Sequence, residues 1–190
     1  MFTLGITGTL GAGKGTVVSY LIEKKGFIHF SVRGYLAEEL TRRGMPVNRD
    51  TLTAIGNSLR AKHGSSFIIE ELFIRAQKER RNCVIESIRT PGEVEALRKE
   101  KGFYLLAVDA DPRLRYKRIR NRNSETDQVS FQTFIQNEER EMHSDDPNKQ
   151  NLAACIKQAD HVINNSGNID RLHQQIEVFL NTVGYNLNNK

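Results

Sequence analysis

The sequence predicts an α/β domain built around a parallel sheet of roughly five strands. Short apolar runs alternate with amphipathic stretches along the chain, which is the pattern of buried strands joined by crossover helices. A glycine-rich turn directly follows the first apolar run and leads into a helical stretch. The length of 190 residues, with 38% hydrophobic residues, supports one buried core. We therefore expect residues 1–190 to form a single domain.

The first half of the chain is expected to supply two strands and a helical insertion. Residues 2–7 predict a buried strand, residues 14–25 a helix, and residues 27–30 a second strand. One face of that helix is apolar, with Val17, Val18, Leu21 and Ile22. Residues 31–80 indicate about three helices and no convincing strand. Their stop signals are Gly44 with Pro46, and then Gly64.

The second half is expected to add three strands. They cover residues 82–88, 103–108 and 161–164. The residues Thr90-Pro91-Gly92-Glu93 form a capping box that opens a helix, and Asp111-Pro112 begins another helix in the same way. Residues 121–150 are polar and dense in charge. Further helices are expected near residues 152–158 and after the last strand, where apolar residues recur at helical spacing in Ile169, Leu172, Ile176, Phe179 and Leu180.

Composition excludes several classes of protein. No run approaches the ~18 apolar residues of a membrane span, and the N-terminal residues lack the features of a secretory signal. Cys83 and Cys155 lie far apart, and the histidines have no metal-site spacing, so we interpret the latter as structural or surface residues. These observations predict a cytoplasmic domain without a membrane partner. The net charge of +5 suggests an anionic ligand without identifying it.

The strongest motif is GTLGAGKGT over residues 8–16, between a predicted strand and a predicted helix. Glycines allow consecutive backbone N–H groups to curve around phosphate oxygens, where a Cβ would obstruct them. The helix N-terminus adds partial positive charge, and Lys14 adds a mobile cation. The motif therefore predicts a nucleotide-phosphate site formed by Gly8, Gly11, Ala12, Gly13, Lys14, Gly15 and Thr16.

One detail narrows the class. The usual loop has Ser or Thr directly after the lysine, whereas this chain has Gly15 there and Thr16 one residue later. The pattern GxxGxGKGT resembles the loop of adenylate kinase and related nucleoside monophosphate kinases. Over these nine residues, the resemblance implies a P-loop NTPase three-layer sandwich that binds ATP. It also implies Mg²⁺ held mostly by phosphates and water, with Thr16 as a candidate metal contact.

The second half of the site is expected where the third strand ends. Glu86-Ser87-Ile88-Arg89 resembles the Asp-Gly-Ile-Arg-Ser pattern of the adenylate-kinase-like and dephospho-CoA-kinase-like group. The resemblance implies that Glu86 holds Mg²⁺ through water and that Arg89 grips the acceptor phosphate. The alternatives are a solvated strand-end acid for Glu86 and an ion pair between Arg89 and Glu93.

A lid is expected over residues 121–150. Arg118 and Arg122 are four residues apart on one helix face and could reach the same phosphate chain. Their spacing resembles the RxxxR lid entry of the family, and guanidinium suits the charge of a transferring phosphoryl group. With Lys14 and Glu86 they form the predicted catalytic set. Alternatively this basic run is a solvated helix face, and Arg140 is either a returning lid arginine or a surface partner.

The acceptor side matches the family less closely. Ala37 stands where the related kinases have a phosphate-binding arginine, so Arg33 and Arg89, with Arg60 as a further candidate, are the predicted acceptor ligands. No carboxylate follows the second strand before Glu38, which favours a phosphate acceptor that needs no base. Residues 159–167, including Asn165, resemble the last strand and adenine-side loop of dephospho-CoA kinases.

These observations predict ATP-dependent phosphoryl transfer to a small-molecule nucleotide acceptor, with a nucleoside or deoxynucleoside monophosphate favoured. The first alternative is dephospho-CoA kinase-like transfer to a ribose hydroxyl. A regulatory or nucleic-acid-binding P-loop protein is the alternative of another class. Positive charge concentrates at the lid rather than along an extended face, which does not favour nucleic acid. We expect a monomer or a homodimer.

Overall fold

The protein folds around one parallel β-sheet. The computed structural model describes residues 2–122, 129–146 and 149–185. The strands are β1 (Thr3–Gly8), β2 (Ile28–Ser31), β3 (Cys83–Glu86), β4 (Phe103–Asp109) and β5 (His161–Asn164). They lie in the order β2-β3-β1-β4-β5, and every neighbouring pair is parallel. The predicted five-stranded parallel sheet is therefore confirmed, with strand ends shifted by up to two residues.

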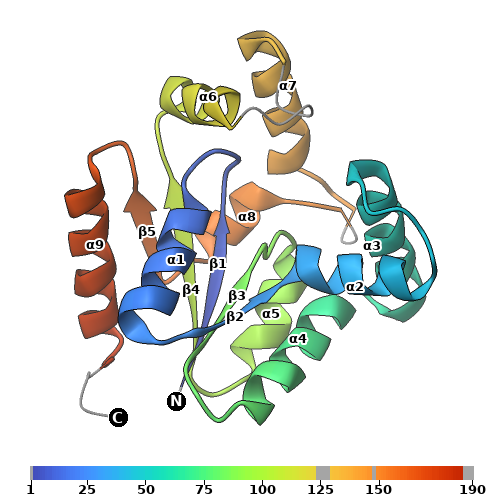
Figure 1. The fold of residues 1–190 in the computed structure, drawn as a ribbon, viewed down its shortest axis with the longest axis horizontal. Helices are drawn as coiled ribbons and strands as arrows, with labels where there is room; N and C mark the ends of the chain where they lie inside the picture. Colours follow the sequence, from blue (N-terminus) through green and yellow to red (C-terminus); the bar gives the residue numbers. More distant parts are fainter. Residues whose placement is uncertain (1, 123–128, 147–148, 186–190) are drawn as a thin grey trace.

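The sheet is buried on both faces because apolar side chains of its strands point to each face. Leu4 and Ile6 of β1 join one core cluster, whereas Cys83 and Ile85 of β3 join the other. The first cluster is closed by α1 (Lys14–Lys25) and α9 (Ile169–Thr182), which lie together on one side of the sheet in Figure 1. The result is the three-layer sandwich predicted from the sequence.

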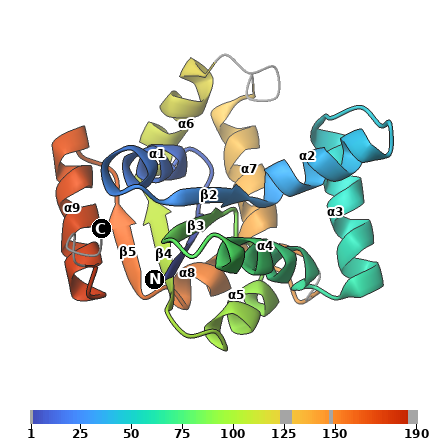
Figure 2. The same cartoon turned by 60° about the horizontal axis from the view of Figure 1, so that its bottom comes forward.

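Helices from several parts of the chain cover the opposite face. They are α2 (Val32–Arg42), α3 (Arg49–His63), α4 (Phe67–Lys78), α5 (Pro91–Arg98) and α8 (Leu152–Lys157). The first three form the predicted insertion over residues 31–80, which extends to the right of the sheet in Figure 1. Figure 2 shows α2 and α3 projecting from the same side of the molecule. The insertion thus flanks the edge of the sheet formed by β2.

One detail of the predicted core is wrong. Val17, Val18 and Leu21 are buried against the sheet, but Ile22 is 40% exposed. In a helix of 3.6 residues per turn, the buried stripe of α1 passes through the first three positions and leaves Ile22 at its margin. The helix otherwise begins and ends where the sequence predicts, at Lys14 and before Gly26.

The segment predicted as a lid contains a helix, α7 (Phe131–Met142), that the sequence analysis did not anticipate. Above the carboxyl ends of the strands in Figure 1 lie α6 (Pro112–Asn121) and α7. The helix α7 is anchored by an aromatic cluster in which Phe131 and Phe134 contact Tyr116 of α6, and Ser130 caps its first turn. Within the predicted lid, residues 123–128 and 147–148 lie outside the described residues. No helix in the described part of the chain is long and apolar enough to span a membrane.

The predicted capping box fixes the turn between β3 and α5. The Thr90 hydroxyl accepts from the Glu93 N–H, and the Glu93 carboxylate accepts from the Thr90 N–H at 3.0 Å. The same carboxylate accepts from the Arg89 N–H at 2.8 Å, and Glu93 is fully buried. A buried carboxylate needs such donors because desolvation of the charge is costly. The buried Glu93 carboxylate therefore holds the backbone of the turn that carries Arg89.

Candidate functional site

The glycine-rich segment forms a tight loop between β1 and α1. Gly8 has φ +131° and Gly13 has φ +96°, a region that side chains rarely adopt. A Cβ on Gly8 would overlap the Val108 carbonyl of β4, and one on Gly13 would overlap the Asn165 side-chain amide. Both positions therefore need glycine for backbone angle and for space. The loop is held closely between β4 and the segment after β5.

Backbone donors of this loop remain available for a ligand. Within the described ranges, no protein acceptor contacts the N–H groups of Gly11, Gly13, Lys14 and Gly15. These groups lie at the N-terminus of α1, where the helix dipole contributes partial positive charge. Gly15 and Thr16 are exposed, and nothing lies within 4 Å of a Cβ built on Gly15. This arrangement suits an anion with several oxygens.

Lys14 places its ammonium inside the same loop. Its Nζ donates to the carbonyl oxygens of Gly8 and Thr9, each at 2.8 Å. Burial, together with the charge of Arg89, lowers the pKa of Lys14 to about 8, while Glu86 oppositely favours the charged form. A cation with this depressed pKa is poised to gain from an anionic ligand.

Glu86 lies at the carboxyl end of β3, as predicted, and has a partner that the sequence analysis missed. His29 Nε2 of β2 lies 3.3 Å from Glu86 Oε2. This contact, with further help from Lys14 and Arg89, holds the pKa of Glu86 below its usual value. Sequence reasoning gave His29 no place in the site because the contact depends on the register in which Ser31 pairs with Glu86. The carboxylate is thus kept ionised beside the loop.

The Arg89 side chain extends toward α7 and Gln150 rather than toward Glu93. Its Nη1 donates to Gln150 Oε1 at 2.8 Å and lies 3.5 Å from Glu141 Oε2 of α7. The ion pair with Glu93 that the sequence left open is made by Arg60 of α3 instead, at 3.4 Å. Glu141 raises the pKa of Lys14, whereas Arg89 lowers it, so both charges are close enough to act on Lys14. Glu141 is a site residue that the sequence analysis missed, because only the folding of α7 brings it there.

The basic helix α6 meets the loop through Arg118. Arg118 Nη2 donates to the Asn165 carbonyl at 2.9 Å, and Nη1 lies 3.4 Å from the Ala12 carbonyl. Asn165 Nδ2 donates to the same Ala12 carbonyl at 2.8 Å. Burial and the neighbouring charge of Arg122 lower the pKa of Arg118, and Arg122 also lowers that of Lys14. Two predicted lid arginines, the loop and Asn165 therefore lie together.

The structure leaves other predicted residues apart from this cluster. Arg33 is exposed in the first turn of α2, and Arg140 is exposed on α7. Among the described residues, no hydrogen bond or ion pair joins either side chain to a site residue. Arg60, by contrast, is nine-tenths buried against Glu93, and its Nε has no partner among the described residues. Its role in the folded chain is that of counter-ion to a buried carboxylate.

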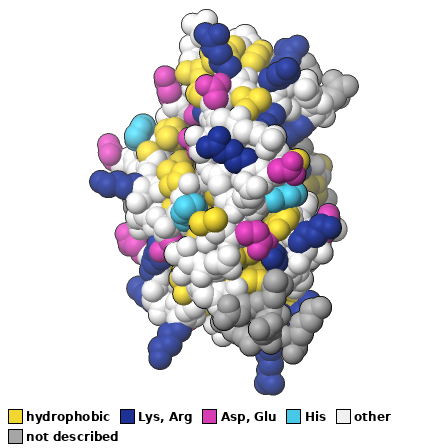
Figure 3. All heavy atoms as spheres, turned by 90° about the vertical axis from the view of Figure 1, so that its left-hand side faces the viewer, with side chains coloured by type: hydrophobic (Ala, Val, Ile, Leu, Met, Phe, Trp, Pro, Cys, Tyr) yellow, Lys and Arg dark blue, Asp and Glu magenta, His cyan; other side chains and the backbone are white. Residues whose placement is uncertain are grey.

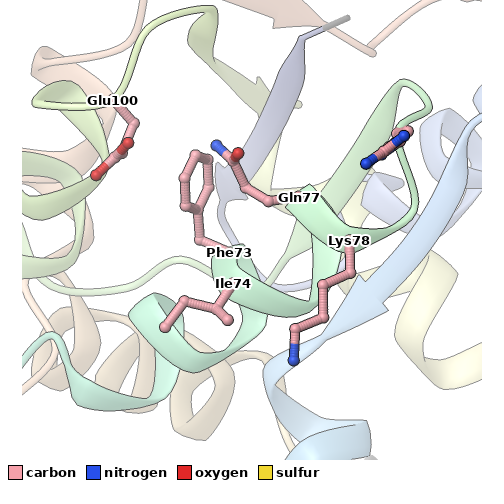
Figure 4. Close-up of a pocket in the computed structure, with 6 residues that line it drawn as sticks. Phe73, Ile74, Gln77, Lys78 and Glu100 are labelled. Carbon is pink, nitrogen blue, oxygen red and sulfur yellow. The ribbon is translucent and has the colours of Figure 1, made fainter.

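The described residues contain no group of three or more His, Cys, Asp or Glu side chains placed to hold a metal ion. A pocket of about 610 Å³ does lie elsewhere, between the C-terminal end of α4 and the segment before β4. Figure 4 shows Phe73 and Ile74 beside Gln77 and Lys78, with Glu100 facing them. Because α4 precedes β3 and Glu100 precedes β4, this pocket is at the opposite edge of the sheet from the loop. It does not belong to the candidate site.

Comparison with known proteins places this geometry in context. Residues 4–144 match the AAA domain family. A UPF0200 protein from Pyrobaculum aerophilum is 31% identical over 175 residues, covering 91% of this chain and 93% of the relative.

Two solved structures share the fold at low sequence identity. TT1252 from Thermus thermophilus superposes with a TM-score of 0.62 at 19% identity, covering 95% of this chain and 97% of that chain. Shikimate kinase from Bacteroides thetaiotaomicron superposes with a TM-score of 0.57 at 15% identity, covering 96% of this chain and 98% of that chain. The fold is therefore an α/β fold of the P-loop NTPase type.

Proposed function

The chain belongs to the UPF0200 family and to the AAA domain family of P-loop proteins, and on that premise we propose that it is an ATP-dependent phosphotransferase for a small-molecule acceptor. The observation that carries the proposal is the loop around Lys14, where backbone N–H groups without an acceptor among the described residues and the Lys14 ammonium lie together at the N-terminus of α1. When phosphate oxygens are bound, the Lys14 Nζ would exchange its carbonyl acceptors for them. Arg118 and Arg122 would neutralise charge on the transferring group.

A magnesium ion fits the donor set. The Glu86 carboxylate is kept ionised by His29 and Lys14, and the Thr16 hydroxyl is exposed at the start of α1. Gly15 supplies no hydroxyl, so the protein would hold the ion mainly through phosphate oxygens and water, with Glu86 accepting from that water. The ion would supply charge neutralisation between the outer phosphates. The chain itself provides binding, orientation and exclusion of water by the lid helices α6 and α7.

We propose a nucleoside monophosphate as the acceptor. Arg89 supports this assignment because its guanidinium lies past the end of β3 and close enough to Lys14 to lower its pKa. Arg33, at the start of the insertion, would be a second phosphate ligand if the insertion closes. The reaction is proposed to take place in the cytoplasm. The chain is proposed to act as a monomer or a homodimer, and light scattering would establish its oligomeric state.

Transfer to the ribose hydroxyl of dephospho-CoA remains the second candidate. The observation in its favour is the pair of His29 and Glu86, since an imidazole beside a carboxylate can accept the proton of a hydroxyl. A nucleic-acid-binding role has less support. On the face over α9 in Figure 3, basic side chains are interspersed with acidic and apolar ones, whereas nucleic acid would favour an extended basic surface.

The test is a coupled ADP-release assay with Mg²⁺ and ATP over all ribo- and deoxyribonucleoside monophosphates and dephospho-CoA. We expect one acceptor, or a small group of monophosphates, to stimulate ADP release well above the rate without acceptor. The Lys14→Ala variant should abolish the stimulation with the fold intact. Lys24→Ala, which removes an exposed charge from the same helix, should keep it.

Three outcomes would contradict parts of the proposal. No stimulation by any acceptor would remove the phosphotransferase assignment. Stimulation by dephospho-CoA alone would replace the monophosphate with the hydroxyl acceptor. Tight binding of DNA or RNA with a steep salt dependence, measured by titration, would favour a nucleic-acid function instead.

A further inference from the structure

Arg115 of α6 is a buried arginine to which the proposed reaction assigns no role. It is only 2% exposed, although it lies in the basic run that would ordinarily be a solvated helix face. A buried guanidinium is stable only when its donors are satisfied. Each of its three nitrogens has an acceptor, and these acceptors come from different segments of the chain.

Two of these acceptors belong to the sheet edge and the phosphate loop. Arg115 Nε donates to the Ala110 carbonyl after β4 at 2.8 Å, and Nη1 donates to the Leu10 carbonyl at 3.3 Å. The backbone of Arg115 also meets the loop, because a Cβ on Gly11 would lie 2.6 Å from the Arg115 carbonyl. Since Leu10 and Gly11 share a peptide, Arg115 fixes the plane of a loop amide.

The third acceptor belongs to the lid helix α7. The Glu138 carboxylate accepts from both terminal nitrogens of Arg115, with Nη2–Oε1 at 2.9 Å. The guanidinium also lies 5.6 Å from the centre of the Phe134 ring of α7. A two-point bond between planar groups restrains orientation as well as distance. Arg115 therefore holds α7 against the loop at one defined angle.

The far end of α7 reaches the acceptor side of the site. Glu141 follows Glu138 by three residues, on a neighbouring helix face, and its carboxylate lies 3.5 Å from Arg89. Arg89 in turn accepts, through its carbonyl, the N–H of Asn151 at 2.9 Å. A continuous series of contacts thus runs from Leu10 through Arg115, Glu138 and α7 to Arg89.

We propose that Arg115 and Glu138 are a positioning pair that couples the phosphate loop to the placement of Glu141 on Arg89. A change in the Leu10–Gly11 peptide on nucleotide binding would be transmitted to α7, which moves as one body. Neither residue touches the reacting atoms. The inference rests on the proposed function for the identity of the nucleotide, but the coupling itself can be measured without any acceptor or turnover.

The experiment is hydrogen–deuterium exchange on the full chain, with and without a non-hydrolysable ATP analogue, for the wild type and for Glu138→Gln. The glutamine keeps the size of the side chain and removes the charge. The matched control is Glu139→Gln, which removes a charge from the neighbouring, exposed position of α7. Arg115→Lys is the second variant, because an ammonium keeps the charge but cannot span the three acceptors.

In the wild type, nucleotide should change exchange in three places: the loop, residues 131–142 of α7, and the Asn151 amide. In Glu138→Gln and Arg115→Lys, α7 should exchange about tenfold faster, and the nucleotide response should be confined to the loop. Glu139→Gln should behave as the wild type. A purely structural pair would loosen α7 but leave the response at Asn151 in place.

When the wild type binds the analogue, two results would overturn the coupling. One is a wild-type response restricted to the loop; the other is an unchanged response at α7 and Asn151 in both variants. Failure of the wild type to bind the analogue would count against the proposed function rather than against the coupling. In that case the unliganded exchange decides: Glu138→Gln must speed exchange both at Ala12, whose N–H bonds to the Thr9 carbonyl, and at Asn151. Unchanged exchange at either amide would overturn the coupling.

Discussion

At the scale of single residues, the glycines of the phosphate loop differ in what they require. Gly13 combines a positive φ with close contact to Asn165, so any side chain there meets both strain and overlap. Gly15 has neither restriction, since its φ is not positive and the space around it is open. The absence of a hydroxyl at Gly15 is therefore not imposed by packing. In the proposed function, this absence leaves the metal to phosphate oxygens and water.

This contrast predicts opposite effects of the same substitution. Gly13→Ala should lower the free energy of unfolding by about 2 kcal/mol or more, because strain at such a backbone position costs roughly 1–3 kcal/mol before the overlap is counted. Gly15→Ala should raise it by up to about 1 kcal/mol, because glycine within a helix is less favourable than alanine. Denaturant unfolding of both variants measures the difference. Equal stabilities would mean that the loop geometry is wrong.

Among the site residues, the sequence was informative where a motif is local. Lys14 and the loop glycines follow from their spacing alone, and Glu86 follows from its place at a strand end. His29 and Glu141 could not be predicted, because each depends on a pairing across the fold. His29 needs the β2–β3 register, and Glu141 needs α7 to fold back over the sheet.

At the scale of elements, the turn between β3 and α5 depends on one buried carboxylate. Glu93 caps α5, accepts from the N–H groups of Arg89 and Thr90, and pairs with Arg60 of the insertion. It thus joins helix α3 to the turn that carries Arg89. The capping box was visible in the sequence, whereas the pairing with Arg60 was not, because it lies 33 residues away along the chain.

Glu93→Ala should therefore be strongly destabilising, by about 3–5 kcal/mol, because it leaves Arg60 buried without a counter-ion and removes a cap. Glu95→Ala, which alters an exposed position of the same helix, should change stability by less than about 0.5 kcal/mol. The double variant Arg60→Met with Glu93→Leu should recover part of the loss, since it removes both buried charges. Thermal unfolding of the variants tests this, and a mild effect of Glu93→Ala would show that the pair contributes little.

Helix boundaries were predicted best where capping residues mark them. The helices α1 and α5 begin at the predicted residues, because Gly13 adopts a left-handed backbone angle before α1, whereas Thr90 caps α5 and Pro91 restricts its first turn. The helix α7 was missed because its surface is polar apart from a small aromatic cluster, and that cluster packs on α6 rather than on the main core. The apolar residues of α7 do recur at helical spacing, but they lie in a polar stretch that the sequence analysis interpreted only as a lid.

At the scale of the whole molecule, the fold brings charged groups from separate segments together around Lys14. Arg89 follows β3 and Arg122 follows α6, and both act on Lys14 after β1. The carboxylates of Glu86 from β3 and Glu141 from α7 act on it in the opposite sense. The parallel sheet makes this convergence possible, since all its strands end at the same edge. The composition shows only the net charge of the chain, whereas the topology shows which charged residues lie near Lys14.

This convergence predicts how nucleotide affinity depends on pH. The pKa of Lys14 is lowered from 10.5 to about 8 in the free protein, chiefly by burial and then by Arg89. Bound phosphate favours the ammonium, so the pKa rises in the complex. Affinity for a non-hydrolysable ATP analogue should therefore be constant below pH 8 and fall above it, by up to about tenfold per pH unit. Titrations from pH 7 to about 10 measure the pH at which the affinity begins to fall, here called the break.

Three variants show whether the break belongs to Lys14. Lys14→Arg stays charged throughout, so its affinity should lose the break whatever its absolute value. Glu141→Gln removes a group that favours the ammonium and should move the break to lower pH. Arg89→Gln removes a group that opposes it and should move the break to higher pH. If the break persists in Lys14→Arg, another group titrates. If Glu141→Gln and Arg89→Gln shift the break in the same direction, Glu141 and Arg89 do not have opposite effects on the pKa of Lys14.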